Sequence, residues 1–367
     1  ALEAALRRLV KRDLNLFLHP GAYYFHDVLP LTERGKLDYR ALEQQTNLYP
    51  YNEELTIDYL KIAIRGTLCA ISGGVCWGFS GTMGQFLFSQ KGLTTSWVTT
   101  VRMLIAGVLL LGVMAARRPK EVRAIGKVWT VKKDVRRLLL FAALGLIPCQ
   151  FTYLECIANS NSATGTALNY LGQMMILLYV CFVTRRLPTR WEITALLLAF
   201  LGVFFLATHG DVHTLVLSPQ ALFWGLIGAV MVVVYNTLPQ RLLRVYGSPV
   251  ITGWGMLLGG VILGLLSRVW TQEVTLDPQT VLGILLIGVV GTAMAFTLYL
   301  QGVNDIGPVK TSLLSCAELV TAGVLTSVWL KTPLAWQDVL GMALILGMVA
   351  FLAVPGRTTP NTTRSNS

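Results

Sequence analysis

Long runs without a charged residue constrain the fold of this chain more than any other feature. Each run approaches or exceeds the roughly 20 residues that an α-helix needs to cross the hydrocarbon core of a bilayer. The runs occupy residues 66–90, 156–184, 214–240, 245–267 and 278–304. The composition agrees, because 54% of the residues are hydrophobic and only 13% are charged. A chain of this kind must meet lipid.

Backbone amides cannot stay unpaired in lipid, so the apolar runs are expected to form helices. Outer-membrane strands would alternate apolar and polar residues, and these runs do not alternate. The sequence predicts an all-α membrane protein with ten transmembrane helices. They are expected over residues 66–88, 94–115, 138–158, 162–184, 191–208, 219–239, 249–268, 280–302, 309–330 and 336–354. Short connections such as "NDIGP" predict that neighbouring helices are antiparallel.

Lysine and arginine residues gather in alternate connections, which predicts the orientation of the helices. The connection after the second helix, "RRPKEVRAIGKVWTVKKDVRR", carries nine of them. Basic residues are retained on the cytoplasmic side during insertion, so both termini are expected in the cytoplasm and the chain in the inner (plasma) membrane. The same residues account for the net charge of +11 without a nucleic-acid partner.

An internal repeat organises the apolar part of the chain. A shift of 145 residues aligns "FTYLECIANSNSATGTAL" with "FTLYLQGVNDIGPVKTSL". The same shift pairs Pro188 with Pro333 and Trp191 with Trp336. Matching proline and tryptophan positions are less expected by chance than matching aliphatic ones, so the repeat indicates a duplication.

The repeat predicts two units of five helices, over residues 62–208 and 219–354. A short cytoplasmic segment over 1–60 precedes them, and a disordered tail over 355–367 follows. An odd number of helices gives the second unit the opposite orientation, so the repeats are expected to be inverted. Inverted repeats can expose a site near the bilayer midplane to each side in turn. A duplicated bundle with a purely structural role is the alternative.

Four motifs within residues 62–355 are similar to one known family. They are "CWGFSG" at 76–81, "TTVRMLIAGVLLL" at 99–111, "SNSATGTALNYLGQMM" at 160–175 and "LYLQGVNDIGPVKTSLLSCAELVTAGV" at 298–324. With the five-plus-five layout, they resemble the EamA-type transporters of the drug/metabolite transporter superfamily. The resemblance implies a secondary carrier with a central cavity lined by both repeats, commonly exporting amino acids or other small metabolites by alternating access. Gly172 and Leu319 stand where that family often has proline. The substrate, the coupling ion and the oligomeric state stay open.

The N-terminal segment carries a resemblance of a different kind. The stretch "DVLPLTERGKLDYRAL" at 27–42 is similar to the final motif of adenylate-forming enzymes, the activating domains of nonribosomal peptide synthesis. In that family the lysine that matches Lys36 contacts the substrate carboxylate, and Tyr39 stands where arginine is usual. Residues 1–60 are interpreted as a remnant of that enzyme's C-terminal subdomain, a fusion junction or a misplaced start. The alternative function is a membrane-tethered adenylating enzyme whose catalytic body lies upstream of Ala1.

One acidic residue stands out within the repeat alignment. Glu318 aligns with Gln173 under the shift, and both fall about ten residues into their predicted helices. An unpaired carboxylate in hydrocarbon costs several kcal/mol, so Glu318 is expected to be protonated, paired or facing a wet cavity. A pseudo-two-fold axis at the midplane would bring the two side chains close together. They are predicted to bind substrate or a proton, unless they only hydrogen-bond the repeats together.

Four further residues complete the predicted transport site. Asn169 and Ser315 lie about one helical turn before the two aligned positions, and Trp77 of the first helix offers an aromatic wall. Arg102 lies about eight residues into the second helix, where a charge is costly unless it faces protein or water. Arg102 is predicted either to bind an anion or to tie the second helix to its neighbours, with Glu155 as its partner.

No other cluster predicts chemistry. His209 and His213 have the spacing of a metal site but sit in a short loop without further ligands. The six cysteines lack metal-ligand spacing, and no catalytic arrangement of Ser, His, Asp or Cys is found. No metal, cofactor or nucleic acid is expected. The expected partners are a small-molecule substrate and the lipid bilayer.

Overall fold

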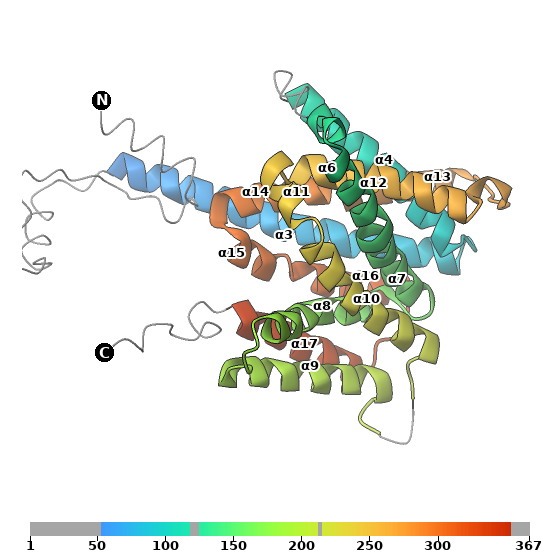
Figure 1. The fold of residues 1–367 in the computed structure, drawn as a ribbon. Helices are drawn as coiled ribbons and strands as arrows, with labels where there is room; N and C mark the ends of the chain where they lie inside the picture. Colours follow the sequence, from blue (N-terminus) through green and yellow to red (C-terminus); the bar gives the residue numbers. More distant parts are fainter. Residues whose placement is uncertain (1–52, 118–124, 212–214, 354–367) are drawn as a thin grey trace, which may run out of the picture.

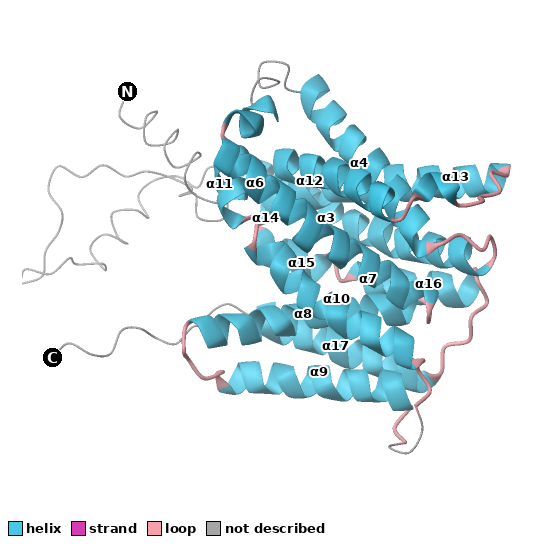
Figure 2. Cartoon of the chain, turned by 45° about the vertical axis from the view of Figure 1, so that its right-hand side comes forward, coloured by secondary structure: helices cyan, strands magenta, loops and turns pink. Residues whose placement is uncertain are grey.

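Helices account for all the regular structure of the described chain. The computed structural model describes residues 53–117, 125–211 and 215–353, and no strand occurs in these ranges. Figures 1 and 2 show the helices packed as one bundle. The predictions for the tail over 355–367, and for nearly all of the segment over 1–60, lie outside the described residues.

The helices follow one another with short connections. The first half of the described chain contains α3 (Glu53–Ser89), α4 (Thr95–Arg117), a 3₁₀ turn (Lys127–Thr130), α6 (Lys132–Leu140), a π turn (Phe141–Leu146), α7 (Ile147–Ala158), α8 (Ser162–Val183) and α9 (Arg190–Thr208). The second half contains α10 (Pro219–Thr237), α11 (Gln240–Tyr246), α12 (Ser248–Leu266), a 3₁₀ turn (Val269–Thr271), α13 (Pro278–Gly288), a π turn (Val289–Met294), α14 (Ala295–Ile306), α15 (Pro308–Leu314), α16 (Ala317–Val328) and α17 (Trp336–Ala353).

Nine helical spans within the described ranges are long and apolar enough to cross a membrane. They are Lys61–Ser89, Thr95–Ala116, Lys132–Ala158, Ser162–Val183, Arg190–Thr208, Pro219–Thr237, Ser248–Leu266, Pro278–Ile306 and Lys310–Val328. A shorter apolar helix, Trp336–Leu352, occupies the position of the tenth predicted span. Large apolar side chains such as Phe182, Phe200 and Leu266 are exposed on the outside, as a lipid-facing surface requires. The all-helical prediction is confirmed for the described chain, and the count of ten spans stays a prediction.

The third span contains a π turn that was not predicted from the sequence. α6, the turn Phe141–Leu146 and α7 run on as one span. Pro148 in the first turn of α7 explains the irregularity, because proline has no N–H to donate and its ring clashes with the carbonyl four residues earlier. The span also begins at Lys132, before the predicted start at residue 138.

The corresponding span of the second half contains the same kind of turn. α13, the turn Val289–Met294 and α14 form one span. This turn, "VVGTAM", has no proline. Here the Thr292 hydroxyl donates a hydrogen bond to the Ile287 carbonyl at 3.0 Å, which satisfies an acceptor where the helical ladder is disturbed. A π turn in the third span of both halves supports the internal repeat.

The span predicted over 309–330 corresponds to Lys310–Val328, but the helix within it is broken between α15 and α16, which was not predicted. Three amides at the junction, those of Cys316, Glu318 and Leu319, bond three residues back rather than four. The Cys316 amide donates to the Leu313 carbonyl at 3.2 Å. The Glu318 amide donates to the Ser315 carbonyl at 2.9 Å. The tightened turn interrupts the regular helix just before the acidic residue that the sequence singled out.

The packing between the two halves repeats when the halves are exchanged. α3 packs on α14 and α16, and its counterpart α10 packs on α7 and α8. α4 packs on its own counterpart α12, and α9 packs on α17. Exchanging each helix for its counterpart in the other half therefore leaves the set of helix contacts unchanged, as a pseudo-two-fold axis requires.

Counterpart helices run in opposite directions where they touch. A Cβ atom on Gly107 of α4 would lie 2.6 Å from the Leu257 amide of α12. One on Gly260, further along α12, would lie 2.8 Å from Leu104, further back along α4. Residue numbers rise along one helix as they fall along the other, so α4 and α12 are antiparallel. Glycine at these crossings lets the two backbones approach closely.

The register of the repeat changes by one residue before the last span of each half. Thr189 caps α9, and Glu192 completes a capping box by accepting from the Thr189 amide at 2.7 Å. At the start of α17, Asp338 accepts from the Ala335 amide at 2.8 Å. Residues 192 and 338 have the same role and are 146 positions apart, so the 145-residue alignment is displaced by one in the last span.

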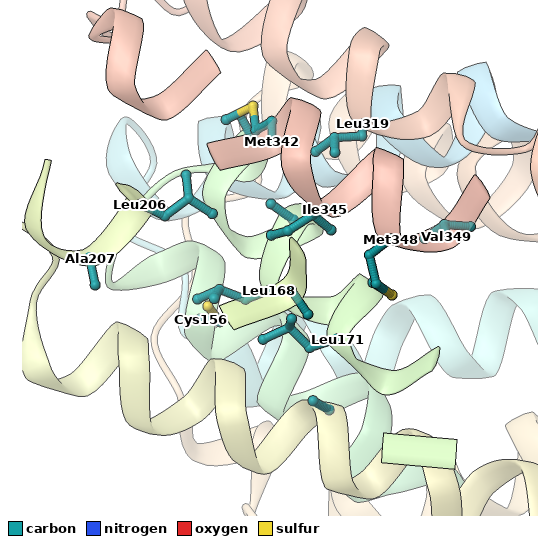
Figure 3. Close-up of a cluster of buried hydrophobic side chains, with 14 of the residues drawn as sticks. Cys156, Leu168, Leu171, Leu206, Ala207, Leu319, Met342, Ile345, Met348 and Val349 are labelled. Atoms are coloured by element: carbon teal, nitrogen blue, oxygen red, sulfur yellow. The ribbon is translucent and has the colours of Figure 1, made fainter. Parts of the chain in front are cut away.

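A cluster of buried apolar side chains joins the last spans of the two halves. Figure 3 shows Leu168 and Leu171 of α8 near Leu206 of α9 and Ile345 of α17, and all four are buried. Within a membrane, close van der Waals packing rather than exclusion of water holds such helices together. α9 and α17 lie side by side at one edge of the bundle in Figures 1 and 2. Helices other than α9 and α17 therefore form the centre of the bundle, between the two halves.

Candidate functional site

A cavity of about 330 Å³ lies between the two halves of the bundle. Helices α3, α4, α7 and α8 contribute from the first half, and α10, α14, α15 and α16 contribute from the second. Its lining residues are Trp77, Ser80, Arg102, Cys149, Gln150, Tyr153, Asn169, Tyr170, Gln173, Val232, Tyr235, Asn236, Gly291, Thr292, Phe296, Tyr299, Ser312, Ser315 and Glu318. The lining mixes aromatic rings with polar groups, as small-molecule sites do.

All six predicted site residues line this one cavity, although they come from four different helices and the junction that precedes α16. They are Trp77, Arg102, Asn169, Gln173, Ser315 and Glu318. The structure therefore brings them together. Their role in transport stays a prediction.

Glu318 lies in the first turn of α16, directly after the break in the helix. The Tyr170 hydroxyl donates to Glu318 Oε2 at 3.3 Å, and it lies equally far from the Ser315 carbonyl. Tyr170 therefore reaches from α8 to the broken helix of the other half. Gln173 lies one turn further along α8 and faces the same cavity, without a hydrogen bond to Glu318.

Arg102 is buried within α4, and its guanidinium donates to Gln150 Oε1 of α7. The predicted pairing with Glu155 is wrong, because Glu155 accepts instead from the Thr95 hydroxyl. The reason is the antiparallel run of α4 and α7. Glu155 lies five residues past Gln150, about 7.5 Å further along the helix, and so meets the beginning of α4.

The predicted aromatic wall at Trp77 has partners that the sequence analysis missed. The Trp77 ring lies 5.3 Å from that of Phe296, edge to face, and 5.1 Å from that of Tyr299. Thr292, Phe296 and Tyr299 are spaced by four and three residues, so they form one stripe on α14 and the turn before it. That spacing was a usable signal in the sequence.

Two tyrosines and a glutamine were missed as well. Tyr153 of α7 bonds the Thr166 hydroxyl at 3.0 Å and lines the cavity near Tyr170 of the next helix. Gln150, the partner of Arg102, lies one turn before Tyr153. The same apolar helices carry other polar residues that face away from the cavity. The sequence alone therefore did not show which polar residues face it.

Ser80 of α3 is buried at the cavity wall, with only 3% of its surface exposed. Its hydroxyl has no hydrogen-bond partner among the described residues. Gly291 lies directly against it, because a Cβ atom at Gly291 would come within 2.3 Å of Ser80. A buried hydroxyl without a partner is costly, so this position favours a polar group inside the cavity.

A buried polar layer lies between the cavity and the loop that follows α3. The Ser162 amide donates to Gln85 Oε1 at 2.8 Å, and the Thr326 hydroxyl donates to the same oxygen at 3.3 Å. Gln85 Nε2 in turn donates to the Thr332 hydroxyl at 3.1 Å. The layer joins α3, α8, α16 and the loop before α17, so it closes the cavity toward this end of the bundle.

Loops at the same end are tied by a salt bridge. Lys91 Nζ lies 2.7 Å from Asp277 Oδ2 and also donates to Gln279 at 2.8 Å. Hydrogen bonds from Lys91 and from Thr280 lower the pKa of Asp277 to about 2. The Asp277 carboxylate is therefore ionised at physiological pH.

The cavity extends toward the opposite end, where Tyr235 and Asn236 line it near the end of α10. Asn236 is exposed, in contrast to the buried Gln85 layer. At this end Arg65 of α3 forms a two-pronged ion pair with Asp305 of α14, with both distances 2.8 Å. The polar layer around Gln85 therefore lies at one end of the cavity, and the exposed Asn236 lies at the other.

The remaining candidate site in the sequence has another role. His209 Nε2 lies 2.9 Å from Asp338 Oδ1, which joins α9 to α17, and His213 lies outside the described residues. No group of three or more His, Cys, Asp or Glu residues in the described ranges is placed to hold a metal ion.

Comparison with known proteins gives one family and one relative. A model of the EamA-like transporter family matches residues 64–208 and 219–354. The "Uncharacterized inner membrane transporter YicL" of Salmonella typhimurium strain LT2 is 33% identical over 293 residues, which cover 80% of this chain and 96% of that protein. A solved crystal structure superposes with a TM-score of 0.55 at 18% identity, over 78% of this chain and 95% of that one, and shows likeness of fold alone.

The family matches span most of the chain, and the relative is similar over nearly its whole length. Both similarities are to transporters, which confirms the prediction of a membrane transporter rather than an enzyme. The cavity between the halves is consistent with that activity. The chain therefore belongs to the EamA-like transporter family.

Proposed function

We propose that this chain is an inner-membrane secondary transporter that exports small zwitterionic metabolites, amino acids first among them, by alternating access. The observation that carries the proposal is the charge of the cavity. Arg102 and Glu318 both line it, and no ion pair joins them. A buried cation and a buried carboxylate that line one cavity without a direct ion pair are suited to a ligand that carries both opposite charges.

An α-amino acid fits this arrangement. Its carboxylate can accept from the Arg102 guanidinium, which presents a planar fork of donors. Its ammonium can donate to Glu318, and the unpaired Ser80 hydroxyl adds a further polar contact. Trp77 and Tyr299 form a wall for the side chain. The volume of about 330 Å³ is at the small end of ligand pockets, which favours single metabolites over large drugs.

Glu318 also supplies a means of coupling. A proton and the substrate ammonium compete for the same carboxylate, so entry of one favours release of the other. Such competition converts an inward proton gradient into outward substrate movement, provided that the cavity opens to one side at a time. Intramembrane carboxylates commonly have this use in transporters.

The inverted repeat supplies the alternating exposure. Two observations support ten spans in two inverted units. α4 and α12 are antiparallel, and counterpart helices of the two halves make equivalent contacts. The Gln85 layer then closes the outer side and the Asn236 end opens to the cytoplasm. The name of the Salmonella relative supports placement in the inner membrane.

Orientation is tested by reporter fusions. With the basic connections inside, a fusion after Arg123 is expected to be cytoplasmic and a fusion after Asp211 periplasmic. The opposite result for both would overturn the inverted arrangement as well as the cytoplasmic location of the termini.

Substrate charge is tested with purified protein in proteoliposomes loaded on one side. Alanine, its amide, lactate and ethylamine are offered with and without an imposed proton gradient. Alanine alone keeps both charges, so it is expected to move at least tenfold faster than the other three, and faster with the gradient. Equal rates for alanine and ethylamine would remove the role of Arg102. Equal rates for alanine and lactate would remove that of Glu318.

The resemblance of residues 27–42 to adenylate-forming enzymes remains a separate prediction. That stretch lies outside the described residues, and the family match begins only at residue 64. We infer that it marks a fusion junction or a remnant, and that transport does not require it. Transport by a chain shortened to begin near residue 53 tests this, because loss of transport with normal membrane insertion would assign the segment a function.

A further inference from the structure

A second cavity lies outside the transport site, where α6, the end of α10 and α11 meet. It measures about 760 Å³. We call it the basic cleft, and its lining residues are Lys133, Arg136, Arg137, Leu140, Thr237, Leu238, Gln240, Arg241, Arg244 and Val245. It shares no residue with the cavity between the halves. Figures 1 and 2 show α11 lying beside α6.

The cleft concentrates positive charge without compensating it. Five of its ten lining residues are basic and none is acidic. Arg137 lies 3.4 Å from Asp134, on the same helix. Arg136, Arg241 and Arg244 have no carboxylate within ion-pair distance among the described residues. Unpaired cations gathered in one concavity favour an anion.

The cleft is built by packing rather than by chance proximity of surface side chains. The Tyr246 hydroxyl donates to Asp134 Oδ2 at 2.9 Å, which ties α11 to α6. Leu242 of α11 and Leu138 of α6 are almost fully buried in one apolar cluster. Two short helices are thereby held so that both present basic residues to the same space.

Apolar side chains line the same cleft at the level of the membrane surface. Leu140, Leu238 and Val245 are exposed by 40%, 41% and 62% respectively. The spans that bound the cleft begin at Lys132 and end at Thr237, so the cleft lies where these helices leave the hydrocarbon. A small soluble anion would make no favourable contact with the exposed aliphatic side chains at this depth. A phospholipid would contact both the basic and the aliphatic side chains, because its phosphate and its acyl chains meet at this depth.

We propose that the basic cleft binds the headgroup of an anionic glycerophospholipid, with the phosphate among Arg136, Arg241 and Arg244 and an acyl chain along Leu140 and Leu238. Arginine is suited to the phosphate because its fork matches two phosphate oxygens. Anionic lipids bind basic pockets between transmembrane helices through the same combination of charge and apolar contact. The site is independent of the proposed substrate.

The test uses the full chain purified in detergent and phosphatidylglycerol as the probe, with binding followed by native mass spectrometry. Phosphatidylglycerol is expected to remain bound where phosphatidylcholine is lost, and R241Q/R244Q is expected to weaken binding about tenfold. The matched control is R185Q/R190Q, which removes two exposed arginines from another connection. R241K/R244K keeps the charge and is expected to retain most of the binding.

Three results would overturn the proposal. The first is equal retention of the two lipids, and the second is equal weakening by the two glutamine pairs. The third is displacement of phosphatidylglycerol by excess inorganic phosphate, which would make the cleft a site for a free anion. If R241Q/R244Q does not fold, binding to R241K/R244K and competition by inorganic phosphate still test the proposal. Binding in detergent depends neither on orientation nor on the transported substrate, so failure here leaves the proposed function untouched.

Discussion

The fourth span of the first half and its counterpart in the second half enter the same cavity with different backbones and different chemistry. α8 is continuous and carries the neutral Gln173, whereas its counterpart is broken before α16 and carries Glu318. The hydroxyl of Tyr170 joins the two by bonding the broken helix from the intact one. The duplication has kept the scaffold symmetric and left the site asymmetric.

This asymmetry divides the work between the halves. The first half provides the cation at Arg102 and the second provides the carboxylate at Glu318. The packing around them stays equivalent, since α3 contacts α14 and α16 just as α10 contacts α7 and α8. A transporter of this kind needs symmetric mechanics to expose the site to both sides, but it needs only one titratable group to couple the movement.

The largest effect is expected from removal of the charge that distinguishes the halves. Glu318→Gln keeps the shape and the hydrogen bond with Tyr170 but cannot hold a proton or an ammonium as a carboxylate does. Proton-driven exchange should fall roughly 10- to 100-fold, which matches the 1.5–3 kcal/mol of a hydrogen bond to a charged group. Exchange rates in proteoliposomes over a range of external pH measure this, and the pH dependence should disappear.

A second substitution sharpens the same test. Adding Gln173→Glu to Glu318→Gln moves the carboxylate to the other half, and part of the lost exchange should return if a two-fold axis relates the positions. Glu155→Gln is the control, because that carboxylate lies outside the cavity. Normal rate and normal pH dependence in the folded Glu318→Gln variant would mean that Glu318 only joins the repeats.

Arg102 tests the contribution of the first half. Arg102→Gln should raise the KM for an amino acid about 10-fold while leaving that for the corresponding amine nearly unchanged, because only the carboxylate contact is lost. Arg102→Lys keeps a charge but not the planar fork of donors. Its KM for the amino acid should therefore lie between those of the wild type and of Arg102→Gln. A uniform loss for both substrates, with a lower melting temperature, would instead make Arg102 a structural charge. Unchanged expression, stability and transport in Arg102→Ala would remove both interpretations.

The seam between α3 and α16 is expected to tolerate little change. A Cβ atom at Gly78 would lie 2.5 Å from the Glu318 carbonyl oxygen, which is backbone and cannot move aside alone. Gly78→Ala should therefore lower the free energy of unfolding by about 1–3 kcal/mol. Gly323→Ala in α16 is the control, since nothing lies within 4 Å of its Cβ position. Thermal unfolding in detergent measures both, and equal effects would show that the seam can adjust.

The sequence was most informative about residues that lipid makes costly. Charge-free runs located the helices, and the expense of a buried charge singled out Arg102 and Glu318. The repeat then added Gln173, and all three line the cavity. Neutral residues such as Gln150 and Tyr153 were missed because their polar atoms cost less in an apolar helix and mark no face by themselves.

The break before α16 could not be predicted for a different reason. Ser315 and Cys316 are tolerated within helices, and nothing in their neighbourhood disfavours one. The Ser315 carbonyl is instead approached by Tyr170, which lies 145 residues earlier in the chain. The π turn before Pro148 was open to prediction, since proline disturbs the helix that precedes it. Tertiary contacts decide the first case and local chemistry decides the second.

The smallest expected effect concerns how the last span of each half begins. Thr189 accepts from the Glu192 amide at 3.3 Å and so closes the capping box of α9, but Ala335 at the equivalent position before α17 has no side chain that can do so. Thr189→Ala should cost about 1 kcal/mol of unfolding free energy, and Ala335→Thr should add a similar or smaller amount. The double variant exchanges the caps and should come out near the wild type in thermal unfolding. If Ala335→Thr is destabilising, then Asp338 alone completes the start of α17, and the one-residue change of register between the halves extends to the geometry of the cap.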